Sequence, residues 1–504
     1  MHKSGSMPSP VLKEGKTAWQ IARADKARIL IDAAAYYNAF MQTARLAERS
    51  IMILGWDMDS RLLLNREASM SPKQRQISRA PEPLEGEPVQ LLTFLNQLLE
   101  EKPDLKIYML NWDYSVIYAL EREAMARIKV FWEANERLEF QFDNNHPLGA
   151  SHHQKVAVID DSVAFAGGID LTGQRWDTPM HLPDEPGRHR PDGESYDSFH
   201  DIQFMVSGEA ARCLGELARN RWMRATGNIP APPPSRNIWP EAVEPWVENV
   251  DVGIIRTDPA FDGRPEVRES EDFLKAAIRS AGDYIYIENQ YLTSTSIGEA
   301  ICEMLEKPEG PEVVIVTPRE CPGWLEEATM GVLRHRVVRS MQESDSYGRL
   351  YLYYPSVDGN DIFVHAKTLI IDNRLAFVGS TNLSNRSMGL DTECSVALDS
   401  ALLEDAKQNG GSERKRILEG AIQDYLCSLL AEHLGQNEAA VKKSLQQDSL
   451  AGTIARFRGG KRSLVPLKTR TEPLLDAVIP QEQVDPEKPI QVEKVLADIL
   501  PLEP

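Results

Sequence analysis

Hydrophobic and polar positions along the chain follow two alternating patterns, one of helical spacing and one of short, continuous apolar runs. Residues 30–49 have apolar positions at helical spacing and are followed by the apolar run 51–56. The same order recurs later, where the helix-like residues 271–280 precede the run 284–287. Short apolar runs between polar segments are typical of buried strands, whereas longer stretches with helical spacing indicate amphipathic helices.

Further elements continue the alternation after each of these pairs. The pattern predicts helices over residues 89–101 and 296–306, and strands over residues 105–110 and 312–317. Helices that alternate with short strands are typical of βαβ units, in which helices cover a parallel sheet. The sequence therefore predicts an α/β fold in which each half is a mixed, mostly parallel sheet flanked by helices.

One segment of the chain occurs twice. Residues 153–171 align without gaps on residues 365–383. Because the segment has only two copies, it indicates a two-fold duplication and not a solenoid. We therefore expect a bilobal molecule whose halves are related by a pseudo-two-fold axis.

A proline cluster near the midpoint of the chain indicates a stiff connector between the halves. The chain is polar at its start and rich in proline and acidic residues at its end. The expected division is an N-terminal extension, a first half, a linker, a second half and a C-terminal strap or tail, over residues 1–29, 30–229, 230–236, 237–464 and 465–504.

Composition and charge narrow the choice of partners and compartments. The 504 residues carry a net charge of −20, which is unfavourable for a protein that follows the phosphates of a nucleic acid. Residues 1–15 lack the apolar stretch of a signal peptide, and no window is apolar enough for a transmembrane helix. The five cysteines are scattered and lack the spacing of a zinc site. We expect a cytoplasmic protein, at most peripheral to a membrane, without nucleic acid, metal or cofactor; export by a signal-less route stays open.

Each copy of the repeat contains the motif H-x-K-x-x-x-x-D. The residues between the lysine and the aspartate are mostly apolar and predict a strand, on which residues two apart point to the same side. We therefore expect the histidine and lysine of each motif to face one cavity, with the aspartate at the end of the strand. One copy of the motif would be weak evidence for an active site, because strand-edge histidines and solvated lysines are common. Two copies within matching sequence are much stronger evidence. The predicted catalytic residues are His153, Lys155, Asp160, His365, Lys367 and Asp372.

These residue types suit the cleavage of a phosphodiester. Lysine places a positive charge beside the non-bridging oxygens, which gain charge in the transition state. A neutral histidine can attack phosphorus and form a phosphohistidine, and a protonated histidine can donate to the leaving oxygen. Two motifs that meet at a pseudo-two-fold axis would supply a nucleophile, an acid and two cations, so that a monomer is sufficient for one site.

Residues after each motif are expected to support the site. Glycines follow both motifs and permit close approach of the backbone to a ligand. Asp170 and Asn382 occupy equivalent positions after the two motifs. We expect Asn382 to bind the phosphate, whereas for Asp170 a supporting role and a structural role in a turn are both open.

A catalytic histidine also needs a hydrogen-bond acceptor on its second ring nitrogen. The sequence offers two acidic residues at strand ends for this purpose. Glu393 is the candidate acceptor for His365, and Asp201 is the candidate for His153.

The chain resembles the phospholipase D superfamily in more than these two motifs. The resemblance covers about residues 30–434 and is strongest to bacterial proteins that are similar to eukaryotic-type phospholipases D. The segments that carry it are Gly-Trp-Asp at 55–57, Gly-Gly-Ile-Asp-Leu at 167–171, Arg-Trp-Asp-Thr-Pro at 175–179, Arg-Trp at 221–222, Ile-Glu-Asn-Gln-Tyr-Leu at 287–292, and 385–393.

The resemblance implies a duplicated phospholipase D fold and a phospholipid substrate at a membrane surface. It implies that the chain hydrolyses or transphosphatidylates glycerophospholipids, with water or an alcohol as acceptor, through a phosphohistidine. It also implies that His153 is the nucleophile and His365 the general acid, an order that chemistry alone leaves open.

Other functions remain as alternatives at this stage. They are a cardiolipin-synthase-like phosphatidyltransferase, a nuclease or other phosphodiesterase of the superfamily, and a non-catalytic protein that binds lipid headgroups. The net charge of −20 argues against a nuclease. The intact motifs in both halves argue against a protein that only binds.

Overall fold

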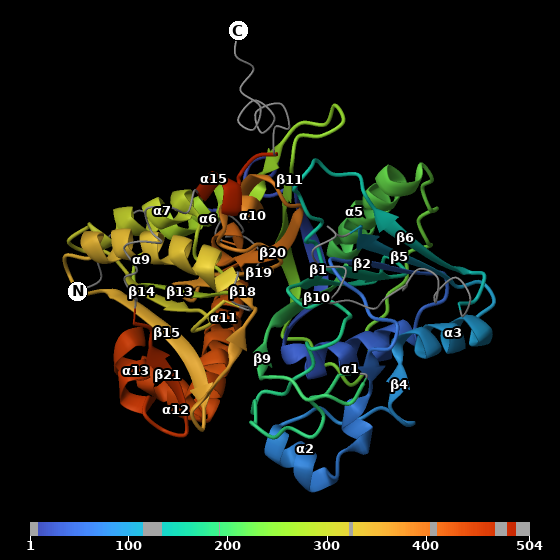
Figure 1. Ribbon diagram of the computed structural model, residues 1–504, viewed down its shortest axis with the longest axis horizontal. Helices are drawn as coiled ribbons and strands as arrows, with labels where there is room; N and C mark the ends of the chain where they lie inside the picture. Colours follow the sequence, from blue (N-terminus) through green and yellow to red (C-terminus); the bar gives the residue numbers. More distant parts are fainter. Residues whose placement is uncertain are drawn as a thin grey trace, which may run out of the picture.

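The computed structural model describes residues 9–113, 134–190, 192–321, 326–403, 411–468 and 481–489. A mixed sheet of seventeen strands runs through both halves (Figure 1). From its outer edge inward, the strands of the first half are β6 (Leu138–Asp143), β5 (Lys106–Trp112), β2 (Ser50–Gly55), β7 (Val156–Ile159), β8 (Val163–Gly167), β10 (Ile202–Gly208) and β1 (Gln20–Ile31). From the centre outward, those of the second half are β11 (Val247–Asp258), β20 (Glu393–Asp399), β19 (Leu375–Gly379), β18 (Lys367–Ile371), β13 (Tyr284–Asn289), β14 (Glu312–Val316) and β15 (Leu350–Val357).

The two halves of the sheet are related by a pseudo-two-fold axis between β1 and β11, which pair antiparallel. Strands at the same distance from this axis correspond, and the motif strands β7 and β18 are one such pair. The outer strands β2, β5 and β6, and likewise β13, β14 and β15, run parallel, whereas each motif strand joins them antiparallel. The predicted α/β class and two-fold duplication are confirmed.

Helices cover both faces of the sheet in each half (Figure 1). In the first half, α1 (Asp32–Ala44) and α3 (Leu91–Glu101) share a hydrophobic core on one face. In the second half, α6 (Glu269–Arg279), α7 (Thr295–Leu305) and α9 (Val332–Ser344) share another. A third core lies under α5 (Glu209–Thr226), α11 (Gly411–Leu434), α12 (Glu438–Leu445) and α13 (Leu450–Phe457).

The remaining strands and helices are short. The sheet also includes β12 (Val267–Arg268), β16 (Asn360–Asp361) and β21 (Arg462–Pro466). Two small sheets pair β3 (Leu63–Leu64) with β4 (Val89–Gln90), and β9 (Phe199–His200) with β17 (Phe363–Val364). The remaining short helices are η1 (Arg66–Ser69), α2 (Pro72–Ser78), η2 (Glu327–Gly331), α10 (Asn385–Gly389), η3 (Ser400–Leu403) and α15 (Gln481–Val484).

The hydrophobic pattern located most of these elements correctly, because the apolar spacing matches the buried faces. In α3, for example, Leu91, Leu95 and Leu98 are buried on one side of the helix, as positions four and then three apart must be. The strand runs beginning near residues 51, 105, 284 and 312 are β2, β5, β13 and β14. Among the described residues, no helix combines the length and apolar content that a membrane crossing needs.

The predicted boundary at residue 30 does not coincide with a structural one. Strand β1 begins at Gln20 and pairs with β10 on one side and β11 on the other, at the centre of the sheet. Its buried residues are mainly alanines, whose weak apolar pattern concealed the strand. At the other end, Asp485 accepts hydrogen bonds from the backbone amides of Asn385 (2.8 Å) and Arg386 (2.9 Å). Part of the expected C-terminal strap therefore packs against α10, while residues 469–480 and 490–504 lie outside the described chain.

Candidate active site

The two motif histidines are held at the junction of the halves by backbone hydrogen bonds. The amide of His153 donates to the carbonyl of Thr392 (2.9 Å), which belongs to the second half. The amide of His365 donates to the carbonyl of His200 (2.8 Å), which belongs to the first half. Each histidine, which lies two or three residues before its motif strand, is therefore attached to the opposite half.

With the backbone arranged in this way, the side chain of each motif histidine contacts an acid of the opposite half. Nδ1 of His153 lies 3.1 Å from both carboxylate oxygens of Glu393, and Nδ1 of His365 lies 2.6 Å from Oδ2 of Asp201. The acceptors predicted from the sequence were the right residues, but their assignment to the histidines was wrong. Glu393 directly follows Thr392, whose carbonyl accepts the amide of His153. Asp201 directly follows His200, whose carbonyl accepts the amide of His365.

Each acid is buried and anchored by further donors. The hydroxyls of Ser387 (2.6 Å) and Ser380 donate to Glu393, and the amide of Ile202 donates to Asp201 (2.7 Å). Burial raises the pKa of Glu393 to about 8, against the lowering effect of the two serine hydroxyls. Ionised Glu393 accepts the Nδ1 proton of His153, which leaves the Nε2 lone pair of that ring free to react.

The lysines lie beside the histidines but differ in their partners. Lys155 Nζ lies 3.3 Å from Oδ2 of Asp170, so its charge is partly neutralised by an acid. Lys367 Nζ donates to Oε1 of the uncharged Gln290 (3.2 Å) and to the carbonyl of His365. Burial lowers the pKa of Lys367 to about 7, although the nearby Asp201 opposes this shift.

The four motif residues share one electrostatic environment. The pKa of His153 is held well below its ordinary value first by burial and then by Lys155 and Lys367. Burial, Lys367, Lys155 and His153 act in the same direction on the pKa of His365. The two lysines therefore add positive potential at both histidines, while the acids Glu393, Asp201 and Asp170 lie in the same site.

The aspartates of the two motifs do not reach this site. Asp160 accepts hydrogen bonds from the backbone amides of residues 48–50 at 2.7–2.8 Å, and Arg236 donates to it at 2.9 Å. Asp372 accepts from the amides of residues 282–284 at 2.6–2.9 Å. The prediction that they are catalytic is therefore wrong. Each carboxylate sits after the far end of its motif strand and fixes the turn that leads into β2 or β13.

The residues at the equivalent positions after the motifs differ in charge. Asp170 accepts the amide of Trp56 (3.0 Å) and contacts Lys155, which ties it to structure on the first side. On the second side, Oδ1 of Asn382 is buried without a hydrogen-bond partner among the described residues. Among the described residues, the lysine without an acid at ion-pair distance is thus Lys367, whereas the open atom of Asn382 is an acceptor and does not itself favour a phosphate oxygen.

Sequence reasoning overlooked several residues around His365. The ring of Phe199 packs against the imidazole of His365 with centroids 5.2 Å apart, and the guanidinium of Arg175 lies 4.9 Å from the centroid of the Phe199 ring. Arg175 also contributes to the lowered pKa of His365, after burial and Lys367. Only the Arg-Trp-Asp-Thr-Pro segment of the family resemblance pointed to Arg175. Gln290 and Ser387 lie within the resemblance segments 287–292 and 385–393 but were given no role there, and nothing in the sequence singled out Phe199 or Ser380.

Comparison with known proteins finds one matching family and several relatives that are named phospholipase D. Residues 274–409, which contain the second motif, match the family described as "Cardiolipin synthase, PLD-like domain". The chain is 24% identical to phospholipase D A of Dictyostelium discoideum over 476 residues, which are 81% of this chain and 35% of the relative. It is 23% identical to phospholipase D1 of Schizosaccharomyces pombe, covering 87% of this chain and 38% of the relative. It is 25% identical to phospholipase D alpha 1 of Carica papaya, covering 77% and 62%.

The chain thus spans between about a third and two thirds of the length of these relatives. Among solved structures, phosphatidylserine synthase of Haemophilus influenzae matches with a TM-score of 0.49 and 14% identity, covering 85% of this chain and 94% of that one.

Proposed function

Since the chain belongs to the phospholipase D superfamily, we propose that it is a phospholipase D, which cleaves glycerophospholipids to phosphatidic acid and the free headgroup. One observation carries the proposal. A carboxylate of the opposite half occupies Nδ1 of each histidine, Nε2 of each has no hydrogen-bond partner among the described residues, and two buried lysines lie beside the histidines. This combination supplies a nucleophile, an acid and phosphate-binding cations in one place.

In the first step, Nε2 of His153 attacks phosphorus while the bond from phosphorus to the headgroup oxygen breaks. His365 gives its Nε2 proton to that oxygen, and the headgroup leaves as the alcohol. Glu393 stabilises the positive charge that develops on the ring of His153. Lys155 and Lys367 stabilise the added charge on the non-bridging oxygens.

In the second step, water attacks phosphorus and the bond from phosphorus to His153 breaks. His365, now neutral, takes a proton from the water, which restores the starting state and releases phosphatidic acid. The assignment of His153 as nucleophile and His365 as acid follows the family resemblance. In the free protein the low pKa of His365 is caused first by burial and then by Lys367, so the bound phosphate anion would help His365 to acquire its proton.

Product analysis tests this function. The full chain would be incubated with vesicles of phosphatidylcholine, phosphatidylethanolamine or phosphatidylglycerol, and with DNA in a separate arm. Mass spectrometry should detect phosphatidic acid from at least one lipid, and His153→Ala and His365→Ala should abolish it. Cleavage of DNA without phosphatidic acid would instead indicate a nuclease, and lipid binding without turnover would indicate a headgroup-binding protein.

Phosphatidyl transfer to an alcohol is the second candidate, and the family description that matches residues 274–409 favours it. The same phosphohistidine would react with a lipid or small alcohol in place of water, again with His365 as base. Adding ethanol or glycerol to the assay separates the two outcomes. If the phosphatidyl-alcohol forms in preference to phosphatidic acid even when the alcohol is dilute, the chain is a transferase. Either reaction would take place with the protein bound peripherally at a membrane surface.

A further inference from the structure

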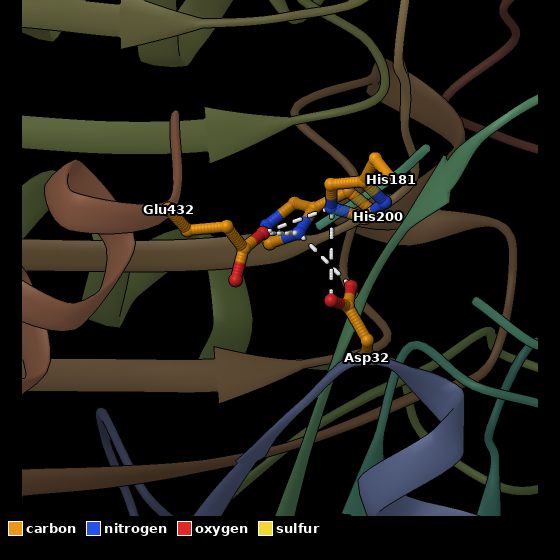
Figure 2. A group of neighbouring side chains, drawn as sticks. All are labelled: Asp32, His181, His200 and Glu432. Atoms are coloured by element: carbon orange, nitrogen blue, oxygen red, sulfur yellow. Dashed lines mark hydrogen bonds and ion pairs between the residues drawn. The ribbon is translucent and has the colours of Figure 1, made fainter. Parts of the chain in front are cut away.

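A group of buried polar side chains lies between the halves, outside the catalytic residues. Its members come from the start of α1, the loop after β8, strand β9 and the end of α11. We name them the interhalf cluster, which consists of Asp32, His181, His200 and Glu432 (Figure 2). These side chains are at most 4% exposed, and each offers one nitrogen or oxygen within 4.8 Å of the others.

The distances within the interhalf cluster suit a tetrahedral ion. Oε1 of Glu432 lies 3.0 Å from Nε2 of His181 and 2.8 Å from Nδ1 of His200. Asp32 places Oδ1 3.1 Å from Nδ1 of His200 and Oδ2 3.6 Å from Nε2 of His181. Around a tetrahedral Zn²⁺ with bonds of about 2.0–2.1 Å, ligand atoms lie about 3.3–3.4 Å from one another. In Figure 2, Asp32 and Glu432 approach the two imidazole rings from different sides.

The outer nitrogens of both rings are held by further carboxylates. Nδ1 of His181 lies 3.0 Å from Oδ2 of Asp177, and Nε2 of His200 lies 2.8 Å from Oε2 of Glu288. A carboxylate behind each histidine is the usual second contact of a metal-bound imidazole, because it fixes the tautomer and makes the ligand nitrogen more basic. The arrangement thus aims one lone pair of each ring at the centre of the cluster.

Without an added proton or metal ion, some ring nitrogens of His181 and His200 would face carboxylate oxygens with no hydrogen between them. A neutral histidine has one proton, and both of its nitrogens here face carboxylate oxygens, so either a second proton or a metal ion must lie between them. A second observation favours the metal. Oδ2 of Asp32 is buried and has no hydrogen-bond partner in the part of the chain that the structure describes, and it lies 3.6 Å from Nε2 of His181, a distance too long for a hydrogen bond. Protons on the rings would leave this oxygen with an ion pair to His181 but without a hydrogen bond, whereas an ion at the centre can bind the carboxylate directly.

The set of donors also selects the kind of ion. Two imidazole nitrogens and two carboxylates favour a borderline transition metal such as Zn²⁺ over Mg²⁺ or Ca²⁺, which prefer oxygen ligands only. Four buried protein ligands leave no position for water or substrate, which is typical of a structural and not a catalytic site. The reaction proposed above therefore gives this ion no chemical step.

The place of the interhalf cluster shows what such an ion would hold together. Asp32, His181 and His200 belong to the first half, and Glu432 belongs to the second. His200 accepts the backbone amide of His365 (2.8 Å), and the amide of Asp32 donates to the carbonyl of Asp201 (2.8 Å). An ion here would link the halves directly behind the Asp201–His365 pair.

We propose that the interhalf cluster binds one structural Zn²⁺ ion, which fastens the two halves of the chain to each other. The proposal does not depend on the substrate of the active site. It differs from the expectation of a metal-free protein, which rested on the absence of cysteine and histidine spacings typical of zinc sites. The four ligands are too far apart in the sequence for any such spacing to reveal them.

Metal analysis of the full chain tests the proposal. The protein would be purified from zinc-supplemented medium, dialysed against a chelator that removes loosely bound metal, and analysed by elemental mass spectrometry. We expect one Zn²⁺ per chain, with X-ray absorption showing two nitrogen and two oxygen ligands at about 2.0–2.1 Å. Zinc-depleted medium should give a protein with a lower melting temperature, because an ion that binds only the folded state stabilises it.

Matched variants locate the ion. Glu432→Gln and His181→Gln should each reduce the bound zinc at least ~100-fold at equal free zinc, in line with the loss of one of four ligands. His189→Ala removes a half-buried histidine from the same loop and should retain one zinc per chain. A folded wild-type protein without zinc after growth in zinc-rich medium would overturn the proposal, since protons would then occupy the cluster. Full zinc content in both ligand variants, or sulfur ligands in the wild-type absorption spectrum, would also overturn it. The spectrum decides the question even if the variants do not fold.

Discussion

The crossed histidine–acid pairs make a prediction that separates this structure from the arrangement expected from the sequence. Glu393→Gln should impair the histidine of the first half, His153, although residue 393 lies in the second half. Asp201→Asn should impair His365 in the same crossed manner. In both variants a neutral amide replaces a carboxyl group that accepts the Nδ1 proton in its ionised form, and the NH₂ group of the amide can force the ring into the wrong tautomer.

The structure sets the size of the effect. A hydrogen bond to a charged group is worth about 1.5–3 kcal/mol, which corresponds to about 10- to 150-fold in rate if the bond strengthens only in the transition state. Glu393 contacts Nδ1 of His153 with both oxygens, and Asp201 approaches His365 to 2.6 Å, so we expect losses at the upper end of this range. The wrong tautomer would add to the loss, because it removes the reacting lone pair or proton.

The assay compares two substrates that differ only in the leaving group. One is a natural phospholipid, and the other carries a p-nitrophenyl group, which leaves without a proton. A variant that has lost the acid should recover activity with the second substrate, whereas a variant that has lost the nucleophile should not, and should form no phosphoenzyme. His153→Ala and His365→Ala provide the reference behaviour, so the test does not presume which histidine attacks.

Glu393→Gln should behave like His153→Ala, and Asp201→Asn like His365→Ala. The reverse match, with each acid variant resembling the histidine variant of its own half, would refute the crossed arrangement. The zinc content of Asp201→Asn serves as a control, because this residue lies next to a member of the interhalf cluster.

Three further predictions follow from the site. Lys155→Ala and Lys367→Ala should each lower turnover by ~10²-fold or more, the usual effect of losing one transition-state contact, and steady-state kinetics would detect it. Asp160→Asn and Asp372→Asn should lower the free energy of unfolding by about 2–4 kcal/mol, measured by denaturant titration, because each carboxylate accepts hydrogen bonds from three backbone amides. The turnover of the folded variants should stay nearly normal, because these contacts lie away from the site. Because burial raises the pKa of Glu393 to about 8 and its ionised form prepares the nucleophile, kcat/KM for the activated substrate should gain a component that rises with pH towards about 8, and Glu393→Gln should remove this component. Lys367, whose pKa burial lowers to about 7, loses its positive charge over the same range, which should bend the profile downward at higher pH.

The sequence predicted those parts of the fold that depend on local pattern. The apolar runs between lysine and aspartate in each motif lie within β7 and β18 because such runs can be buried on both faces of a sheet. Of the two histidines and two lysines, only Lys367 lies within a strand, so strand geometry alone does not account for the position of each lysine beside its histidine. Strand β1 was missed because a strand of small residues between charged ones lacks a strong apolar pattern.

The pairing of acids with histidines depends on tertiary structure and has no local pattern. Glu393 and Asp201 are both acidic residues after short apolar strands, so chemistry alone gave no reason to prefer one partner over the other. What decides the pairing is which half supplies the carbonyl for each histidine amide, and that is fixed by packing across the pseudo-two-fold axis. The interhalf cluster is a stronger example, since its ligands range from Asp32 to Glu432.

Neither half of the chain contains both a motif histidine and the acid that contacts its Nδ1. His153 depends on Glu393 and His365 depends on Asp201, so the pseudo-two-fold interface is itself part of the site. In a symmetric dimer of one half, both histidines would have identical surroundings, and nothing would decide which one attacks. Joining the halves in one chain removes that constraint, because the equivalent acceptors can differ. A glutamate held by two serine hydroxyls faces one histidine, and an aspartate held by a backbone amide faces the other. The two rings can therefore differ in pKa, as a reaction needs when one histidine must begin neutral while the other carries the proton.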